Sequence, residues 1–450
     1  MRTSIRTTDT PAESNAVGRH LKRLALLDPA PIAGRVTRVA GLVVESSGPL
    51  ASIGDVCEIQ LRDGRRLQAE VVGFRDGGLI SVPLGETAGI CPGDRIVARG
   101  SSMRVPSGIG LLGRVIDGMG HPIDGHGPLA STTTASLKSP AMNPLARANV
   151  TTPIGTGVRA LDGFLTVGRG QRIGVFGGSG VGKSTLLGMI TRGTEADIVV
   201  LALVGERGRE VRAFLEDELG EAGRAKSVVV VSTSDSPPLA RIRAAYTATA
   251  IAESFRKDGA NVLLMVDSIT RLAMAQREIG LAAGEPPTTK GYPPSVFAML
   301  PGLLERAGNL RGQGSITAVY TVLMDADDIT EPVTDAVRGI LDGHVMLSRD
   351  LASQGHYPAI DVLGSISRSM SAIVTPEHAS QAARARSWLA ALRANDDLLS
   401  VGAYVAGSQP VLDAAIDHRD RLREFLCQPA DTLCSLSDAL AALAGVAGAD

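Results

Sequence analysis

Hydrophobic and polar positions follow three different patterns along the chain. From Ile32 to about Arg99, short Val, Ile and Leu runs are separated by glycines, which is typical of a small β-barrel. A Gly- and Pro-rich connector from about 100 to 155 follows, and longer apolar runs then alternate with helical patterns. That alternation predicts a largely parallel sheet covered by helices on both faces. After about Ser380 the chain is rich in Ala, Leu and Arg with helical periodicity, which predicts a helical C-terminal domain.

These patterns predict an α/β protein with a β-barrel before the sheet and helices after it. The expected barrel strands are 34–36, 41–44, 57–59, 69–73 and 79–82. The expected strands of the sheet are 172–176, 198–204, 227–232, 262–266, 316–323 and 345–347, with helices beginning near Lys183, Glu210, Pro238 and Val333. C-terminal helices are expected over Ala382–Ala394 and Val411–Leu426. We therefore divide the chain into segments 1–30, 31–100, 101–380 and 381–450.

Composition narrows the function classes further. The chain has 45 Lys plus Arg against 47 Asp plus Glu, so it has no overall positive field with which to hold a nucleic acid. Its four cysteines form no CxxC pair, which favours reduced thiols in a cytosolic protein. The longest apolar runs are far shorter than the roughly 20 residues of a membrane helix. The N-terminus shows no apolar stretch of a signal peptide, so we expect the protein to stay in the cytoplasm.

A phosphate-binding loop lies between an expected strand and an expected helix. Its residues are Gly177, Gly178, Ser179, Gly180, Val181, Gly182, Lys183, Ser184 and Thr185, and the first eight match the pattern GxxxxGK[ST]. Such a loop points backbone N–H groups at phosphates, while Lys183 reaches the β- and γ-phosphates and the Ser184 hydroxyl coordinates Mg²⁺. The alternative is a chance glycine-rich turn in a chain with 52 glycines. Because a strand and a helix bracket the match, the sequence favours nucleotide binding.

Two acids follow strands of the same sheet. Asp267 ends the apolar run 262–266 and is placed to hold the Mg²⁺, although an Asp after a strand is often only a helix cap. Glu206 follows the run 198–204 and is our candidate for the base that polarises the attacking water. Its alternative is a solvated charge at a helix start, where acids are favoured.

With these motifs in place, the chain resembles rotary-type ATPase subunits and, within them, the flagellar and type III secretion export ATPases. The resemblance runs from about Ile32 to Leu426. The segments that carry it are 177–185, 205–210, 267–271, 284–295 and 356–361. It implies a RecA-like P-loop ATPase core and hydrolysis of ATP with Mg²⁺.

The resemblance also implies roles for single residues. Glu206 is the base, Arg207 and Arg271 contact phosphate, and Tyr357 stacks on adenine. Arg368 matches the arginine that reaches into a neighbouring subunit's site, which implies a homo-hexamer; a surface ion pair is its ordinary alternative. Ala430 stands where the synthase has an aromatic residue in the adenine pocket, so adenine selectivity is expected to be looser.

Partners and location follow from the same resemblance. Leu21, Leu24 and Leu27 lie on one face of a short expected helix in the basic leader, which is implied to bind a dimeric stator-like regulator. A central stalk protein, export substrates and their chaperones are the other implied partners. The protein is expected at the cytoplasmic face of the inner-membrane export gate, with peripheral membrane association only. Residues 331–344 resemble the flagellar enzymes more than the virulence-type ones.

Three alternatives remain at this stage. A nucleic-acid-translocating hexamer of the same core needs stacking aromatics in its N-terminal module, whereas the expected barrel contains Phe74 alone. A non-catalytic ring subunit has no need of Glu206 beside Lys183 and Asp267. A catalytic subunit of a proton-driven ATP synthase is disfavoured by the export-type segment 284–295 and the basic leader.

Overall fold

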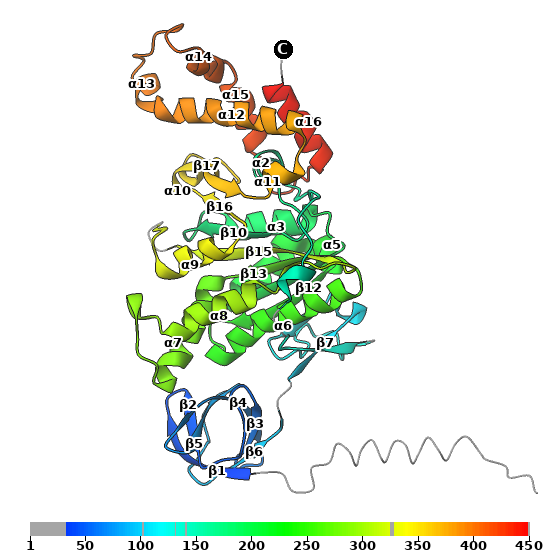
Figure 1. Cartoon of the computed structure of the whole chain (residues 1–450), viewed down its shortest axis with the longest axis vertical. Helices are drawn as coiled ribbons and strands as arrows, with labels where there is room; N and C mark the ends of the chain where they lie inside the picture. Colours follow the sequence, from blue (N-terminus) through cyan, green and yellow to red (C-terminus); the bar gives the residue numbers. More distant parts are fainter. Residues whose placement is uncertain (1–32, 101–102, 131, 140–141, 325–327, 449–450) are drawn as a thin grey trace, which may run out of the picture. The chain divides into compact units, whose positions relative to one another are not determined.

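A computed structural model describes residues 33–100, 103–130, 132–139, 142–324 and 328–448. The chain divides into two compact units, Met1–Pro83 with Thr87–Ser101 and Leu84–Glu86 with Ser102–Asp450 (Figure 1). The segment 20–27, for which the sequence predicts an amphipathic helix, lies outside the described residues.

A closed barrel of antiparallel strands forms the first unit, in the order β1-β2-β5-β4-β3-β6. The strands are β1 Ala33–Ala40, β2 Val43–Ser46, β3 Val56–Gln60, β4 Arg66–Arg75, β5 Gly78–Pro83 and β6 Arg95–Ala98. Side chains of alternate residues point inward, and Val36, Val44, Ile59, Val71 and Ile96 form the core. The expected barrel is confirmed, with β6 as a strand that the sequence did not single out.

The second unit contains a mostly parallel sheet, as the alternating pattern predicts. Among the described residues its order is β17-β16-β10-β15-β13-β11-β12-β8, with β14 beside β15. Strands β17 and β14 are antiparallel to their neighbours, and the other pairs are parallel. The bounds are β8 Val115–Asp117, β10 Arg172–Gly177, β11 Ile198–Glu206, β12 Ser227–Thr233, β13 Asn261–Asp267, β14 Gly308–Asn309, β15 Ser315–Leu323, β16 Gly343–Leu347 and β17 Ile360–Ser367.

The connector from 100 to 155 contains more structure than its composition indicates. Strand β8 joins the edge of the large sheet beside β12. Strands β7 Arg104–Ser107 and β9 Thr133–Ser136 form a separate two-stranded sheet. Short 3₁₀ turns are η1 Ile109–Leu111 and η2 Pro144–Ala146. Strands of three or four residues between glycines have too little periodicity to be recognised in a sequence.

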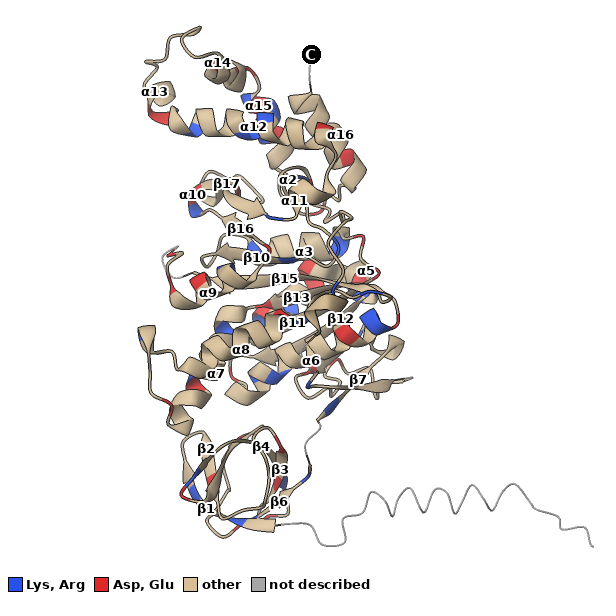
Figure 2. Ribbon diagram, in the orientation of Figure 1, with Lys and Arg blue, Asp and Glu red and all other residues tan. Residues whose placement is uncertain are grey.

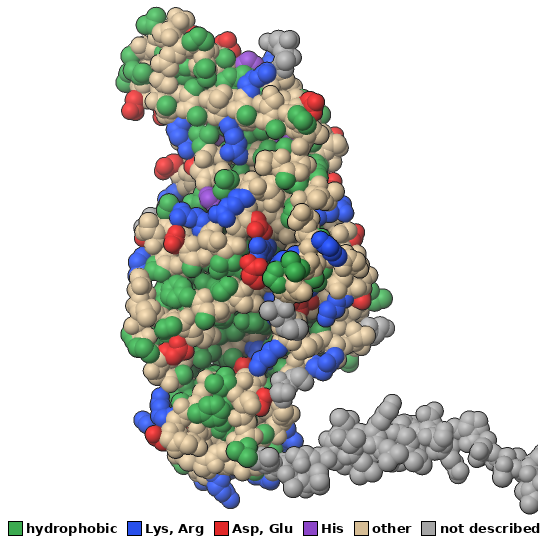
Figure 3. Space-filling model, viewed as in Figure 1, with side chains coloured by type: hydrophobic (Ala, Val, Ile, Leu, Met, Phe, Trp, Pro, Cys, Tyr) green, Lys and Arg blue, Asp and Glu red, His purple; other side chains and the backbone are tan. Residues whose placement is uncertain are grey.

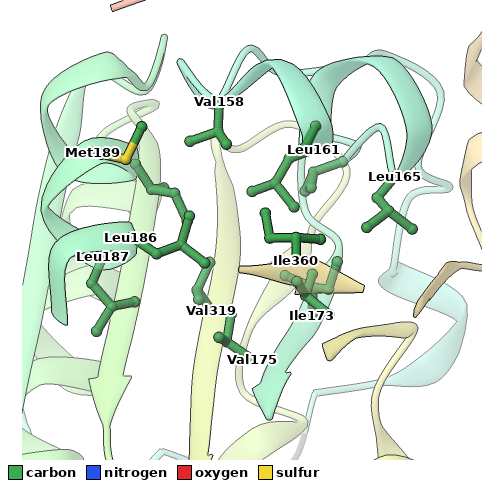
Figure 4. Close-up of a cluster of buried hydrophobic side chains, with 14 of the residues drawn as sticks. Val158, Leu161, Leu165, Ile173, Val175, Leu186, Leu187, Met189, Val319 and Ile360 are labelled. Carbon is green, nitrogen blue, oxygen red and sulfur yellow. The ribbon is translucent and has the colours of Figure 1, made fainter. Parts of the chain in front are cut away.

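Helices cover both faces of the sheet: Figure 1 shows α3 and α5 on one side and α6, α7 and α8 on the other. Helix α3 packs Leu186, Leu187 and Met189 against Val175 and Val319 of the sheet (Figure 4). This packing fixes the helix that follows the phosphate-binding loop. The bounds are α2 Arg159–Phe164, α3 Lys183–Gly193, α4 Gly208–Ala213, a π-helical turn η3 Phe214–Leu219, α5 Gly220–Ala225, α6 Pro238–Lys257, α7 Ile269–Ala283, η4 Thr289–Gly291, α8 Pro294–Leu304, α9 Pro332–Ile340, α10 Arg349–Ser353 and α11 Met370–Ile373.

The C-terminal part is helical, as expected, and packs against helix α2 of the preceding domain through an aromatic contact. Its helices are α12 Pro376–Ala394, α13 Asp396–Ser400, α14 Pro410–Asp417, α15 Arg419–Leu426 and α16 Leu436–Ala447. The expected single run 411–426 is divided at His418, which stacks on Trp388 with ring centroids 4.3 Å apart. Phe425 of α15 lies edge-on to Phe164 of α2 at 5.7 Å.

The distribution of charged residues and the hydropathy of the helices complete the description of the fold. Figure 2 shows acidic and basic residues interspersed along the ribbon. In the described part of the chain, no helix is both long and apolar enough to cross a membrane.

Candidate active site

The phosphate-binding loop lies between β10 and α3 and is built on glycines. Gly180 and Gly182 have φ values of 80° and 86°, a region of backbone conformation that favours glycine. A Cβ on Gly177 would lie 2.9 Å from the Cβ of Leu347, so the strand end also requires a residue without a side chain. Val181 is buried and anchors the loop, while Ser179 and Gly180 are exposed. The loop therefore presents its backbone to solvent at the start of α3, the arrangement that binds phosphate.

Lys183 and Asp267 form a buried ion pair at the carboxyl edge of the sheet. Lys183 Nζ lies 2.9 Å from Asp267 Oδ1, and both side chains are more than nine-tenths buried. Strand β15 separates their strands, and its Thr321 donates a hydrogen bond of 2.6 Å to the same Asp267 oxygen. The sheet thus brings together two residues that lie 84 positions apart in the sequence.

Glu206 lies beside this pair, at the end of β11. The guanidinium of Arg271, from α7, is 3.3 Å from the Glu206 carboxylate and also donates to the Gly205 carbonyl. Burial, followed by the nearby charge of Asp267, raises the pKa of Glu206 to about 7, and the Arg271 and Lys183 charges offset part of that rise. A carboxyl group with such a pKa can accept a proton near neutral pH.

Tyr357, in the turn before β17, lies beside the phosphate-binding loop. A Cβ on Gly182 would lie 3.5 Å from the Tyr357 ring, which is half-exposed. The Gln428 N–H donates a hydrogen bond of 2.9 Å to the Tyr357 carbonyl, so the segment that ends at Ala430 lies on the same side. An exposed aromatic face beside a phosphate-binding loop is suited to stacking on a nucleotide base.

Residues suited to hold Mg²⁺ are present in the same place. The Ser184 hydroxyl and the Asp267 carboxylate are hard oxygen ligands, and Ser184 is exposed to solvent. Among the described residues no cluster of three or more His, Cys, Asp or Glu side chains could hold a metal ion. This donor set fits a Mg²⁺ that keeps waters and substrate phosphates as its other ligands.

Two arginines proposed from the sequence lie away from this cluster. The Arg207 side chain is 68% exposed and lies 3.6 Å from Glu210. Arg368 is exposed at the end of β17, and its N–H donates to the Asp342 carbonyl, at the start of β16. That is the opposite edge of the sheet from the phosphate-binding loop, because β16 is parallel to β10 and β17 is antiparallel to β16. At about 3.3 Å per residue, the five steps from Arg172 to Gly177 span about 17 Å, farther than one side chain reaches.

The sequence reasoning did not identify two polar partners of the site. Thr321 orients Asp267, and Glu218 of η3 accepts a hydrogen bond of 2.8 Å from the Thr185 hydroxyl. A threonine in an apolar strand and an acid in an acidic helix leave no local signal, so only the fold could reveal them.

Comparison with known proteins agrees with this geometry. Residues 157–367 match the ATP synthase alpha/beta family, nucleotide-binding domain, residues 36–100 its beta-barrel domain, and residues 374–445 the T3SS EscN ATPase C-terminal domain. The chain is 53% identical to the flagellum-specific ATP synthase of Bacillus subtilis, over 92% of this chain and 95% of that one. It is 50% identical to the type 3 secretion system ATPase of Xanthomonas euvesicatoria, over 97% and 98%.

A solved structure of high similarity is that of the assembled ATPase EscN from the enteropathogenic E. coli type III secretion system. It has a TM-score of 0.87 and 44% sequence identity, and the match covers 92% of this chain and all of that chain. A second structure of EscN, in complex with its central stalk EscO, matches with a TM-score of 0.85 at the same identity and coverage.

Proposed function

The chain belongs to the family of flagellar and type III secretion ATPases, and from that premise we propose that it hydrolyses ATP with Mg²⁺ at sites shared between identical subunits of a ring. The relatives named above are a flagellum-specific ATP synthase and a type 3 secretion system ATPase, which supports an export system over a nucleic-acid translocase. The ring is a homo-hexamer in this proposal, because one chain supplies both the phosphate-binding loop and Arg368.

The chemistry assigns one task to each residue. Lys183 neutralises the β- and γ-phosphate charge. Ser184 and Asp267 would hold the Mg²⁺, which would supply further positive charge to the phosphates. Glu206 takes a proton from the attacking water, and Arg271 orients its carboxylate. Tyr357 supports the adenine, and Arg207 reaches phosphate after turning away from Glu210.

One observation carries the proposal of shared sites: Arg368 lies about 17 Å along the sheet from its own phosphate-binding loop. It cannot complete the site of its own chain, but it is exposed and free to reach a neighbour's site. An arginine supplied in trans is worth roughly 10³ to 10⁵ in rate. A chain built in this way is slow until it assembles.

A mixing experiment tests this proposal. Glu206→Gln chains keep a working Arg368 and lack the base, whereas Arg368→Ala chains keep the base and lack the arginine. Each variant should be inactive alone, and mixed rings should regain activity at interfaces that pair an intact site with an intact arginine. A Glu206→Gln, Arg368→Ala double variant mixed with Arg368→Ala is the control that should stay inactive. No recovery in rings shown to contain both chains would refute the assignment in trans.

We further propose that this ring energises protein export through a flagellar apparatus, at the cytoplasmic face of the inner-membrane export gate. The segment 331–344 and the 53% identity to a flagellar relative support the flagellar machine over a virulence-type one. A central stalk protein, a stator-like regulator dimer, and export substrates with their chaperones are its proposed partners; EscN has been solved with such a stalk. Restoration of swimming to a strain that lacks its own flagellar export ATPase tests the assignment, and restoration of type III secretion alone would overturn it.

A further inference from the structure

Strand β17 connects two parts of the proposed mechanism. Tyr357 lies just before its beginning, beside the chain's own phosphate-binding loop, and Arg368 follows its end at the opposite edge of the sheet. Between them the pairing with β16 is irregular. Met346 faces Asp361, but His344 faces Ile366, so five residue steps in β17 lie opposite two in β16. Residues 362–365 therefore form a bulge, which is followed by the paired residues Ile366 and Ser367 and then by Arg368.

The side chain of Asp361 closes this bulge. Its Oδ1 accepts hydrogen bonds from the N–H groups of Leu363 and Gly364, each 3.1 Å long. The Ser365 hydroxyl donates to the Asp361 carbonyl and accepts a hydrogen bond of 2.8 Å from the Met346 N–H. Burial raises the pKa of Asp361, but the bonds from Arg393 and from these N–H groups outweigh it and hold the pKa below its ordinary value. The carboxylate is therefore charged at neutral pH and fixes the path of the chain through the bulge.

Asp361 also binds the C-terminal helices. Arg393 of α12 donates to both of its oxygens, at 2.6 Å to Oδ1 and 3.3 Å to Oδ2. The guanidinium and the carboxylate thus form a two-point contact of defined geometry. Figure 3 shows basic side chains near α12 and β17 on this face of the molecule.

Packing fixes one side of the bulge and leaves the other side open. Val362 is buried in the hydrophobic core. A cavity of about 300 Å³ lies between β17 and the C-terminal helices, lined among others by Leu363 of the bulge, Leu389 and Leu392 of α12, and Leu422 of α15. A side chain that borders a cavity lacks packing partners on that side. The hydrogen bonds of Asp361 therefore restrain the part of the bulge that borders the cavity, together with the His344 ring nitrogen that lies 3.2 Å from the Gly364 carbonyl oxygen.

We propose that Asp361 is a positioning residue for Arg368, and that its bond to Arg393 makes the position of Arg368 depend on helix α12. This inference rests on the proposed function, in which Arg368 acts on a neighbouring subunit's site. A partner that displaces α12 would then change the rate of the neighbouring site without touching its nucleotide. The coupling needs no movement of the phosphate-binding loop, since Tyr357 and Arg368 lie on opposite sides of the bulge.

Steady-state kinetics of the assembled ring give the first test. Asp361→Ala should lower kcat at least tenfold, because misplacement by about 1 Å can cost as much as a hundredfold. Arg393→Met should lower kcat several-fold, and Arg393→Lys should recover part of that loss. Binding of a fluorescent ATP analogue should stay within twofold in all three variants. The control is Arg241→Met, which removes an arginine–carboxylate pair between α6 and α7, in which one guanidinium nitrogen of Arg241 donates to both oxygens of Glu278, and which should leave kcat within twofold.

Mixed rings give the second test and separate a misplaced arginine from general damage. Asp361→Ala chains should regain activity with Glu206→Gln chains, which supply a sound Arg368, and should gain none with Arg368→Ala chains. Recovery with neither partner would mean that Asp361 supports its own site, and recovery with both would mean that its Arg368 works normally; either result overturns the inference. Asp361→Asn, which keeps an acceptor oxygen, and Arg393→Met serve in the same mixtures if Asp361→Ala does not assemble.

The reference mixture of Glu206→Gln with Arg368→Ala distinguishes the two levels of the argument. If it recovers and the Asp361→Ala mixtures do not behave as stated, the positioning role is wrong and shared sites stand. If the reference mixture itself fails, the proposed function is overturned, and the positioning role with it.

Discussion

Replacement of Glu206 by Gln removes one buried charge and leaves the shape of the side chain unchanged. The Glu206 carboxyl is 13% exposed and lies near the charge of Asp267. Its pKa is raised from the ordinary 4.5 to about 7. The ionised carboxylate therefore costs the folded state up to about 3 kcal/mol.

The sign of the effect follows from the direction of this shift. A folded-state pKa above the unfolded value means that the folded protein binds the proton more tightly. The stabilisation by that proton is therefore fully present below about pH 4.5 and is lost as the pH rises through about 7. The neutral Gln side chain is insensitive to this change. We expect Glu206→Gln to be more stable than the parent chain by up to about 3 kcal/mol at pH 8, and by about 1 kcal/mol at pH 5.

Thermal unfolding of the nucleotide-free chain at the two pH values measures this difference. The Tm of Glu206→Gln should exceed that of the parent by several degrees at pH 8, and the gap should narrow at pH 5. Glu216→Gln is the matched control: it removes the charge of a side chain that is 56% exposed and pairs with Arg212, so its effect on Tm should be small at both values. An equal Tm gap for Glu206→Gln at pH 5 and pH 8 would contradict the argument.

The same ionisation should appear in catalysis. A base must be deprotonated before it can accept the proton of water, and kcat/KM reports the free enzyme. We therefore expect kcat/KM to fall with unit slope below about pH 7 and to level off above it. A profile that is flat between pH 6 and pH 8 would remove Glu206 from the role of base.

Three further predictions use the same assembled enzyme. Lys183→Ala should abolish binding of a fluorescent ATP analogue, whereas Glu206→Gln should retain binding and lose turnover; equal loss of affinity in both would argue against the base. Thr321→Val removes the hydrogen bond to Asp267, so the Mg²⁺ concentration for half-maximal activity should rise about tenfold, while an unchanged value would separate Thr321 from the metal site. Deletion of residues 1–27 should leave ATP hydrolysis per ring nearly unchanged and abolish capture by the regulator, and undiminished capture would refute the role of the leader.

Local patterns predicted the fold, and they singled out the candidate residues that the structure brings together at Lys183, Glu206 and Asp267, since both depend on short stretches of chain. An apolar run that ends in glycines or in an acid can be recognised from the sequence alone, as at Lys183 and Asp267. The two acids and the lysine then meet because parallel strands end at one edge of the sheet. The resemblance supplied what patterns could not, namely the roles of Tyr357 and Arg368.

Features that depend on pairing between distant segments could not be predicted in this way. Strand β8 is three residues long and gains its stability from β12, more than 100 positions later. Thr321 is one of several hydroxyl-bearing residues in β15, and its contact with Asp267 exists only because β15 lies between β10 and β13. The bulge in β17 likewise reflects its register against β16 and has no sequence period of its own.

In the proposed ring of shared sites, the direction of β17 explains why one kind of chain is sufficient. The strands from β16 to β8 in the order of the sheet all run parallel to one another. Their carboxyl ends therefore place the phosphate-binding loop, Glu206 and Asp267 at one edge of the sheet. Because β17 runs the opposite way, it begins at that edge with Tyr357 close by and ends at the other edge with Arg368. A parallel strand in its place would have reversed this arrangement and put the arginine on the chain's own nucleotide. The antiparallel strand thus has one end beside the chain's own phosphate-binding loop and the other at the opposite edge of the sheet, and in the proposed ring this second end acts on the site of a neighbouring subunit.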